Sequence, residues 1–246
     1  AGVRARAREM AVMTAGCSAR HRNCRALVVV AKAPLIGEVK TRLCPPLTPS
    51  EACTLYGCLL EDIVTKMADY HEAELWIAFA PGGEDYFQRT FAEGRRLLSQ
   101  RGRDLGEKVH HIFVDLFRLG YQQVVVADSD SPTVPLSSVA RAYKLLGREG
   151  CDLVLGPSID GGYYLVGLKS PTEGLFRQIP WSSAAVLQKT LGRASELGLR
   201  AELLPPAYDI DVEKDLRQLW EDLKALPELQ ERAPRTHAFL TRLFTD

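Results

Sequence analysis

The stretch ALVVVAKAPLIGEVKTRL, residues 26–43, decides how the chain folds. It begins with four consecutive aliphatic residues at 27–30, without polar alternation, which is typical of a strand buried on both faces of a sheet. The strand runs directly into a loop that contains Pro34 and Gly37 and carries three basic residues and one acidic residue: Lys32, Lys40, Arg42 and Glu38. A lysine ammonium and an arginine fork suit phosphate oxygens, so the loop predicts a polyphosphate site at the end of the strand.

Strands and helices alternate along the rest of the chain. Apolar residues at helical spacing predict helices at 49–67, 105–119 and 135–149, a weaker helix near 85–94, and a helix at 212–223. Apolar runs predict strands at 73–81, 95–100, 122–127, 151–158 and 163–169. This alternation indicates an α/β fold with a mostly parallel sheet and helices on both faces.

The last two of these strands are predicted to form a hairpin. Only a short turn with Asp160, Gly161 and Gly162 separates the run at 151–158 from the run at 163–169. Two strands joined by an Asp-Gly turn are typically antiparallel, so the sheet is predicted to be mixed.

The length of the chain favours one domain, and its balanced charge indicates that any anion-binding site is confined to a small part of the surface. The 246 residues suit a single large domain, which we expect at 26–246, and the 31 basic residues balance the 31 acidic ones. A balanced charge argues against a nucleic-acid partner, and no apolar run is long enough to span a membrane. Residues 1–25 are rich in Arg and lack the apolar segment of a secretory signal; we expect a frayed extension, with Met10 or Met13 as an internal start, although a transit peptide fits loosely.

The cysteines and histidines predict no catalytic role. The six cysteines form no C-x-x-C motif and none has a histidine at zinc-finger spacing, which favours plain thiols and a cytoplasmic location. None of the five histidines stands near a serine or cysteine in a nucleophile context, so no catalytic triad is expected.

Acidic residues follow several predicted strands. Asp128 and Asp130 end the strand at 122–127, Asp160 follows the strand at 151–158, and Asp209 and Asp211 precede the helix at 212–223. Ligands of open α/β sheets bind at the carboxyl ends of the strands, so we expect these residues to converge on the basic loop. Carboxylates suit Mg²⁺ or Mn²⁺, and we expect Asp130 to share the ion with Asp211, taken to lie at a distant strand end.

Each of these features also has a purely structural interpretation. The basic loop matches neither a Walker A nor a G-x-G-x-x-G motif and can be a solvated loop. Asp128 and Asp130 can form a helix cap and a turn, and Asp160 can be an ordinary Asp-Gly turn residue. Asp211 can cap the helix at 212–223, with Asp209 at the surface.

Six motifs in a fixed order resemble a known family. They are AKAPLIGEVKTRL, QRGRDLGEKV, ADSDSPTVP, GPSIDGGYYLVGL, WSS and DIDVEKDL, within residues 26–223. Together they resemble the GT-A-fold family labelled radical-SAM/selenodomain-associated transferase 1. More distantly they resemble GT-A nucleotidyltransferases, including the 2-phospho-lactate and molybdenum-cofactor guanylyltransferases, and nucleotide-sugar glycosyltransferases. The resemblance implies a single-domain GT-A three-layer sandwich, with a nucleotide-binding half in the first strands and an acceptor half in the later ones.

The resemblance also implies roles for individual residues. Catalytic roles fall on Lys40, Arg42, Asp130 and Asp160. The nucleotide would contact Ala31, Lys32, Gly37, Lys40, Arg42, Leu105, Gly106 and Asp128. The acceptor would contact Asp160, Gly161, Gly162, Tyr163 and Trp181. Asp130 and Asp211 would hold Mg²⁺ or Mn²⁺. The chain departs from the family at Asp128, where Gly is usual, and at Lys108, where Arg is common.

Three functions are consistent with these residues. The first is a metal-dependent nucleotidyltransferase that couples a nucleoside triphosphate to a small phosphorylated acceptor and releases pyrophosphate, which the basic loop favours. The second is a glycosyltransferase that uses a nucleotide sugar, which the literal D-x-D at 128–130 favours, with Asp160 as the base. The third is a nucleotide-binding protein without turnover.

Overall fold

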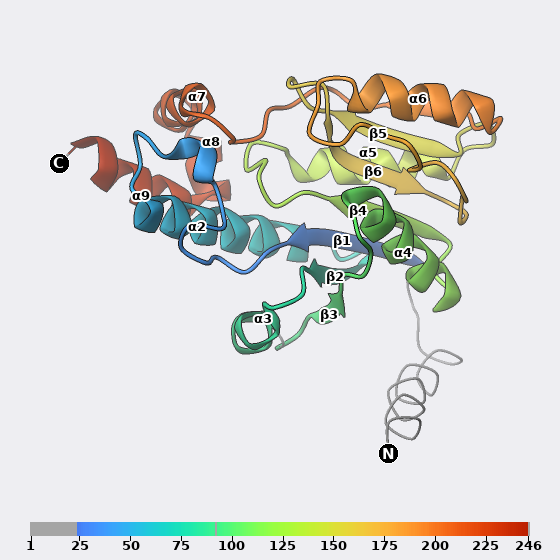
Figure 1. The fold of residues 1–246 in the computed structure, drawn as a ribbon, viewed down its shortest axis with the longest axis horizontal. Coiled ribbons are helices and arrows are strands. Elements are labelled where there is room, and N and C mark those ends of the chain that lie inside the picture. Colours follow the sequence, from blue (N-terminus) through green and yellow to red (C-terminus); the bar gives the residue numbers. More distant parts are fainter. Residues whose placement is uncertain (1–23, 92, 246) are drawn as a thin grey trace, which may run out of the picture.

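A single sheet runs through the computed structural model, which describes residues 24–91 and 93–245 (Figure 1). Within these residues the strand order is β3-β2-β1-β4-β6-β5-β7. The strands are β1 Arg25–Ala31, β2 Glu74–Phe79, β3 Arg96–Ser99, β4 Gln123–Ala127, β5 Leu153–Pro157, β6 Tyr163–Leu168 and β7 Ala201–Leu203.

The sheet is mixed, as the sequence predicts. In the described part of the chain, β6 alone runs antiparallel to its neighbours β4 and β5, while all other paired strands are parallel. The predicted hairpin is therefore confirmed. Strand β7 is not predicted from the sequence, because its three residues are all exposed and carry no apolar pattern.

The helices are η1 Thr41–Leu43, α2 Pro49–Ala68, α3 Glu84–Phe91, α4 Leu105–Arg118, α5 Leu136–Leu146, α6 Val186–Glu196, α7 Glu213–Ala225, α8 Pro227–Arg232 and α9 Pro234–Thr245. The sequence places α2, α4, α5 and α7 to within a few residues at most ends and leaves out α6, α8 and α9. Helix α2 starts sharply because Thr48 and Glu51 form a capping box: each side chain accepts a hydrogen bond from the backbone N–H of the other.

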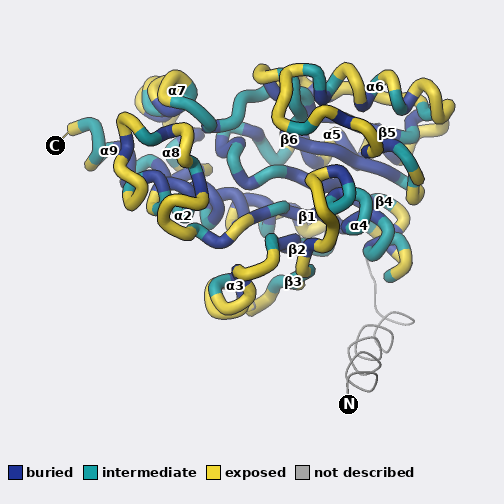
Figure 2. Tube along the Cα trace, viewed as in Figure 1, coloured by how far each residue is buried: buried dark blue, intermediate teal, exposed yellow. Residues whose placement is uncertain are grey.

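Two apolar clusters cover the two faces of the sheet. Figure 2 shows buried residues through the middle of the molecule and exposed residues on the outer helices and loops. On one face, residues of α2, α3 and α5 pack against β1 and β4, with Tyr143 and Phe87 among the largest buried side chains. On the other face, α4 packs with Phe113 and Ile112 against the same strands, and α6 adds Ala194. These layers confirm the predicted α/β sandwich.

A third apolar cluster attaches the C-terminal helices to the outer side of α2. It joins Leu43 of η1 and Leu59 of α2 to Leu219 of α7, Leu229 of α8 and Leu240 of α9. Figure 1 shows these helices gathered at one end of the sheet, beside α2. The cluster therefore supports the end of the first loop at η1 and the start of α2.

The predicted N-terminal extension at 1–25 lies almost wholly outside the described residues, and β1 begins at Arg25. The described cysteines are free thiols: Cys24, Cys44, Cys53, Cys58 and Cys151. Within the described residues, each helix is too short or too polar to cross a membrane.

The buried carboxylate of Asp62 ties α9 to α2. Its side chain has 0% exposure and accepts hydrogen bonds from the backbone N–H groups of Arg235 and Thr236, at 3.2 and 2.8 Å. Because D62A leaves these groups without their acceptor, we expect it to lower the free energy of unfolding by about 3 kcal/mol. The matched control is E61A, which removes only the exposed ion pair of Glu61 with Arg235. It should cost less than about 1 kcal/mol in urea denaturation; equal losses would contradict the capping role.

Candidate functional site

Three segments meet at the carboxyl ends of β1 and β4. The two strands end side by side, because their register pairs Val29 with Ala127. The third segment precedes α7, and the backbone N–H of Ile210 in it donates to the carbonyl oxygen of Asp130 at 3.2 Å. The prediction that Asp211 lies at a strand end is therefore wrong. It stands in the loop between an isolated bridge at Ala207 and helix α7, because no further strand forms after Leu203 in the described chain.

Lys40 joins these segments at the centre of the cluster. Its Nζ lies 3.1 Å from Oδ2 of Asp130 and 3.0 Å from Oδ1 of Asp211, and only 5% of its side chain is exposed. Burial alone lowers the pKa of Lys40, but the charges of Asp130 and Asp211 and their hydrogen bonds outweigh burial and raise it above its ordinary value. Lys40 is therefore a charged ammonium at neutral pH.

Two further observations concern the ability of the cluster to hold a cation. Oδ1 of Asp130 is buried and has no hydrogen-bond partner among the described residues. A buried oxygen of this kind, next to a second carboxylate, fits a hard divalent ion that completes its shell with phosphate or water oxygens. Arg42 lies at the rim, with Nη1 3.3 Å from Oδ2 of Asp211 and 70% of its side chain exposed, so it is free to turn toward a ligand.

Asp128 and Asp209 are two further carboxyl groups beside this cluster. Burial and the carboxylate of Asp130 raise the pKa of Asp128 to about 7. Asp128 accepts hydrogen bonds from the hydroxyl of Ser131 at 2.7 Å and from the backbone N–H of Asp130. Burial also raises the pKa of Asp209, which accepts a hydrogen bond from Ser158 at 2.8 Å. Asp128 is therefore a turn residue, and Asp209 is half-buried rather than a surface residue.

The structure rejects the capping alternatives for Asp130 and Asp211. Helix α5 begins after Pro135, without a side-chain cap. At the start of α7, the side chain of Asp215 accepts hydrogen bonds from the backbone N–H groups of Asp211 and Val212. Asp211 therefore does not cap α7, and its carboxylate faces Lys40 and Arg42.

The residues predicted for the acceptor gather around the β5–β6 turn. Asp160 is exposed, and its Oδ1 accepts a hydrogen bond from the backbone N–H of Gly162 at 2.8 Å. This bond confirms its role in the turn, while its carboxylate is near enough to raise the pKa of Asp209. The rings of Tyr163 and Trp181 meet edge to face, with centroids 6.2 Å apart.

Gly106, at the start of α4, packs closely against Trp181 of this aromatic pair. A Cβ at Gly106 would come within 2.6 Å of the carbonyl oxygen of Phe176 and within 2.8 Å of Nε1 of Trp181. The preceding Leu105 is 46% exposed. The structure thus brings Leu105 and Gly106, predicted for the nucleotide, next to Trp181, predicted for the acceptor.

The remaining predicted residues lie on the β1 loop. Ala31 is the buried last residue of β1, Lys32 is exposed, and its backbone N–H donates to the hydroxyl of Tyr56 at 3.0 Å. Gly37 is exposed with φ +81°, a left-handed conformation that favours glycine. These residues line the path from the strand to Lys40.

Two residues of α2 hold the loops in place and are missed by the sequence analysis. The hydroxyls of Tyr56 and Ser129 share a hydrogen bond of 3.0 Å. The buried Nζ of Lys66 donates to the carbonyl oxygens of Pro132 and Val134, at 3.0 and 2.7 Å. The sequence could have indicated that Lys66 is buried. It follows the apolar Leu59 by seven residues, about two helical turns, and therefore lies on the same buried face of α2.

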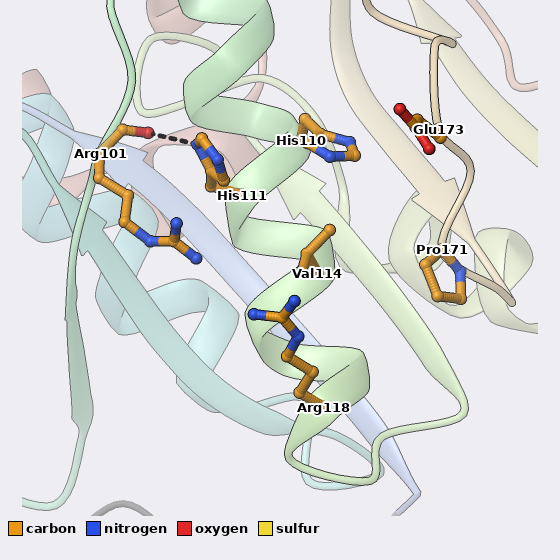
Figure 3. A pocket seen from close by; sticks show the side chains of 7 residues that line it. All are labelled: Arg101, His110, His111, Val114, Arg118, Pro171 and Glu173. Carbon is orange, nitrogen blue, oxygen red and sulfur yellow. Dashed lines mark hydrogen bonds between the residues drawn. The ribbon is translucent and has the colours of Figure 1, made fainter. Parts of the chain in front are cut away.

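A cleft of about 470 Å³ lies elsewhere, against the outer side of α4 (Figure 3). Its lining contains none of the residues predicted from the sequence: Arg101, His110, His111, Val114, Arg118, Pro171 and Glu173. Arg101 is already paired with Asp115, and Glu173 with Arg177. This cleft is therefore separate from the carboxylate cluster.

The sheet and the cluster at its edge define a GT-A-like fold of the nucleotide-diphospho-sugar transferase type. A solved structure described as a "putative nucleotide-diphospho-sugar transferase" from Desulfovibrio desulfuricans G20 is 30% identical, with a TM-score of 0.82, over 89% of this chain and 95% of that one. Residues 63–183 match DUF2064, described as an uncharacterized protein conserved in bacteria. The chain belongs to this family.

Two other proteins share parts of the sequence or the fold. The 2-phospho-L-lactate guanylyltransferase of Methanothermobacter thermautotrophicus is 28% identical over 124 residues, which are 50% of this chain and 53% of that protein. The chain thus spans about half the length of this curated relative. The 4-diphosphocytidyl-2C-methyl-D-erythritol synthase of Anaerococcus prevotii is 10% identical over 78% of this chain and 92% of that one, with a TM-score of 0.54, and shares the fold.

Alanine substitutions at two glycines test how tightly the turn between β5 and β6 is packed. Gly161 has φ +94°, and a Cβ there would collide with the carbonyl oxygen of Ala184. Gly37 also has a positive φ, but a Cβ there meets no atom within 4 Å. We expect G161A to lower the free energy of unfolding by more than about 2 kcal/mol, and G37A by about 1 kcal/mol. Urea denaturation measures both, and equal losses would show that contact with Ala184 does not constrain the turn.

Proposed function

We propose that the protein is a nucleotidyltransferase that couples a nucleoside triphosphate to a small phosphorylated acceptor. The observation that carries this proposal is the cluster of Lys40, Arg42, Asp130 and Asp211 at the carboxyl edge of the sheet. Two cations beside two carboxylates suit a triphosphate whose leaving oxygens need positive charge in addition to a metal.

In the proposed reaction a phosphate oxygen of the acceptor attacks the α-phosphorus of the nucleotide. The new P–O bond forms as the bond from the α-phosphorus to the bridging oxygen breaks, and pyrophosphate leaves with the bonding electrons. Lys40 and Arg42 would orient the triphosphate and stabilise the charge on the leaving oxygens. Asp130 and Asp211 would hold Mg²⁺ or Mn²⁺, which supplies further stabilisation of phosphoryl charge when bound. No protein nucleophile is required.

The relative from Methanothermobacter supports this choice, since its name describes guanylyl transfer to 2-phospho-L-lactate. We therefore propose GTP as the first nucleotide to test and a small phosphorylated acid as the acceptor class. The turn with Asp160, Gly161 and Gly162, together with Tyr163 and Trp181, would form the acceptor side. We further propose that residues 26–246 form one catalytic domain, that the narrower radical-SAM/selenodomain-associated family applies, and that the protein works in the cytoplasm.

A second candidate is glycosyl transfer from a nucleotide sugar. The similarity to the Desulfovibrio structure favours it, because that protein is described as a nucleotide-diphospho-sugar transferase. In this case the metal would bind the diphosphate of the donor, and Asp160 would activate an acceptor hydroxyl.

The products separate the two candidates. We expect a mixture of GTP, Mg²⁺ and a phosphorylated hydroxy acid to release pyrophosphate, seen by ³¹P NMR, because Lys40 and Arg42 would stabilise the charge on the leaving oxygens. Each of the other three nucleoside triphosphates replaces GTP in parallel reactions. Release of a nucleoside diphosphate from a nucleotide sugar, without pyrophosphate from any triphosphate, would establish glycosyl transfer instead.

Two Asp-to-Asn variants test whether the site has a nucleotide-binding half at Asp130 and an acceptor half at Asp160. We expect D130N to abolish metal-dependent nucleotide binding, because it removes a charged carboxylate that would bind the metal. The circular dichroism spectrum of D130N should match that of the unsubstituted protein, which shows that the variant is folded. D160N should keep the nucleotide Kd within about twofold and raise the acceptor KM, since an Asn can still accept the hydrogen bond from Gly162. Isothermal titration calorimetry measures the first effect and initial rates the second. Normal nucleotide affinity in D130N would contradict the metal assignment.

Arg42 provides a test at a residue that is not itself a proposed metal ligand. We expect R42M to weaken triphosphate binding by about 2 kcal/mol, roughly 30-fold, because it removes a charge-assisted contact to a phosphate oxygen. R141M, which removes an exposed arginine on α5, serves as the control for overall charge. If R42M and R141M bind GTP equally well, the basic loop is only a solvated surface.

A further inference from the structure

Lys40 occupies the place that the proposed metal would need. Its Nζ lies 3.0–3.1 Å from one oxygen of each carboxylate expected to bind the ion. A magnesium ion binds carboxylate oxygens at about 2.1 Å and strongly repels a neighbouring ammonium. The ammonium and the ion therefore cannot both lie between Asp130 and Asp211.

We propose that Lys40 is an exchangeable internal cation, which holds Asp130 and Asp211 together until a divalent metal replaces it and frees it to bind the phosphates of the incoming nucleotide. The inference rests on the proposed function, because it takes the two carboxylates as the metal ligands. It goes further in giving Lys40 two positions and in making metal binding and nucleotide binding depend on each other.

The backbone of Lys40 is consistent with a residue that moves. Lys40 has φ 50° and ψ 33°, a left-handed conformation that costs a non-glycine residue about 1 kcal/mol. Residues 35–38, including Gly37, are exposed, whereas Val39 directly before Lys40 is buried in the core. Leu43 is also fully buried and anchors the short helix η1 after Lys40. The exchange therefore moves the side chain of Lys40, while Val39 and Leu43 keep the core in place.

The charges also favour exchange over a permanent lysine. With Lys40 in place, Oδ1 of Asp130 has no partner in the described part of the protein, so the ammonium satisfies the carboxylate only in part. A divalent ion would neutralise both carboxylates and leave the ammonium without its partners. The phosphates of a nucleotide would then supply its counter-charge. Metal binding without nucleotide should therefore be weak, and the metal–nucleotide complex should bind tightly.

Binding of Mn²⁺ can be measured without any turnover, from the loss of the electron paramagnetic resonance signal of free Mn²⁺. We expect K40M to bind Mn²⁺ at least tenfold more tightly than the unsubstituted protein when nucleotide is absent, because its competitor is gone. K144M, which removes an exposed lysine on α5, should leave the Mn²⁺ affinity within twofold. Adding D130N to K40M should abolish the gain, which would assign the ion to Asp130.

The outcomes separate this inference from the proposed function. If the unsubstituted protein binds Mn²⁺ in the presence of GTP, but K40M binds Mn²⁺ alone no better than the unsubstituted protein does, the exchange is wrong and the metal site stands. If neither protein binds Mn²⁺, with or without GTP, the metal site fails and the exchange fails with it.

A second measurement uses the protein without substitution, so it does not depend on how K40M folds. Amine acetylation followed by mass spectrometry reports how accessible each lysine is. Lys40 should be protected without metal, become several-fold more reactive in Mg²⁺, and be protected again when GTP is added. Lys66 is the buried reference and Lys144, on α5, the exposed one. Continued protection of Lys40 in saturating Mg²⁺ would overturn the exchange.

Discussion

The ammonium group of Lys40 determines the geometry of the whole site. Two carboxylates that each lie about 3 Å from one nitrogen would repel each other strongly without a cation between them. The raised pKa values of the neighbouring Asp128 and Asp209 reflect burial first and, in addition, the other carboxylates gathered at this edge. A single positive charge therefore allows segments as far apart as 171 residues in the chain to meet at one edge of the sheet.

The apolar core fixes the residues on either side of this charge. Leu43, next to Arg42, and Ile210, next to Asp211, are both fully buried in the cluster formed with the C-terminal helices. Lys66 of α2 holds the loop that follows Asp130, because its ammonium donates hydrogen bonds to two backbone carbonyl groups of that loop. The C-terminal helices thus act on the site indirectly, by holding α2 and the two loops against the sheet.

Much of this arrangement follows from local sequence patterns. The buried strand at 26–31, the basic loop and the DSD at 128–130 predict that these residues share one edge of the sheet, because parallel strands end at the same edge. The parallel pairing of β1 with β4 brings them there. Local patterns do not predict the partner of Lys40, since a lysine suits phosphate and carboxylate equally well. They also miss β7, whose residues are exposed, and they place Asp211 on a strand that does not form, because both features depend on tertiary contacts.

The structure shows that the two aspartates of the DSD motif at 128–130 have different partners. A D-x-D pair is expected to bind the metal through carboxylates, but here the two aspartates face different groups. Asp128 accepts hydrogen bonds from Ser131 and the backbone of Asp130, and its raised pKa disfavours the charged form that a metal needs. Only Asp130 faces the cation, and its partner is Asp211, from a distant loop. The literal motif therefore gives little support to glycosyl transfer, and the choice between the two reactions depends on the cations of the first loop.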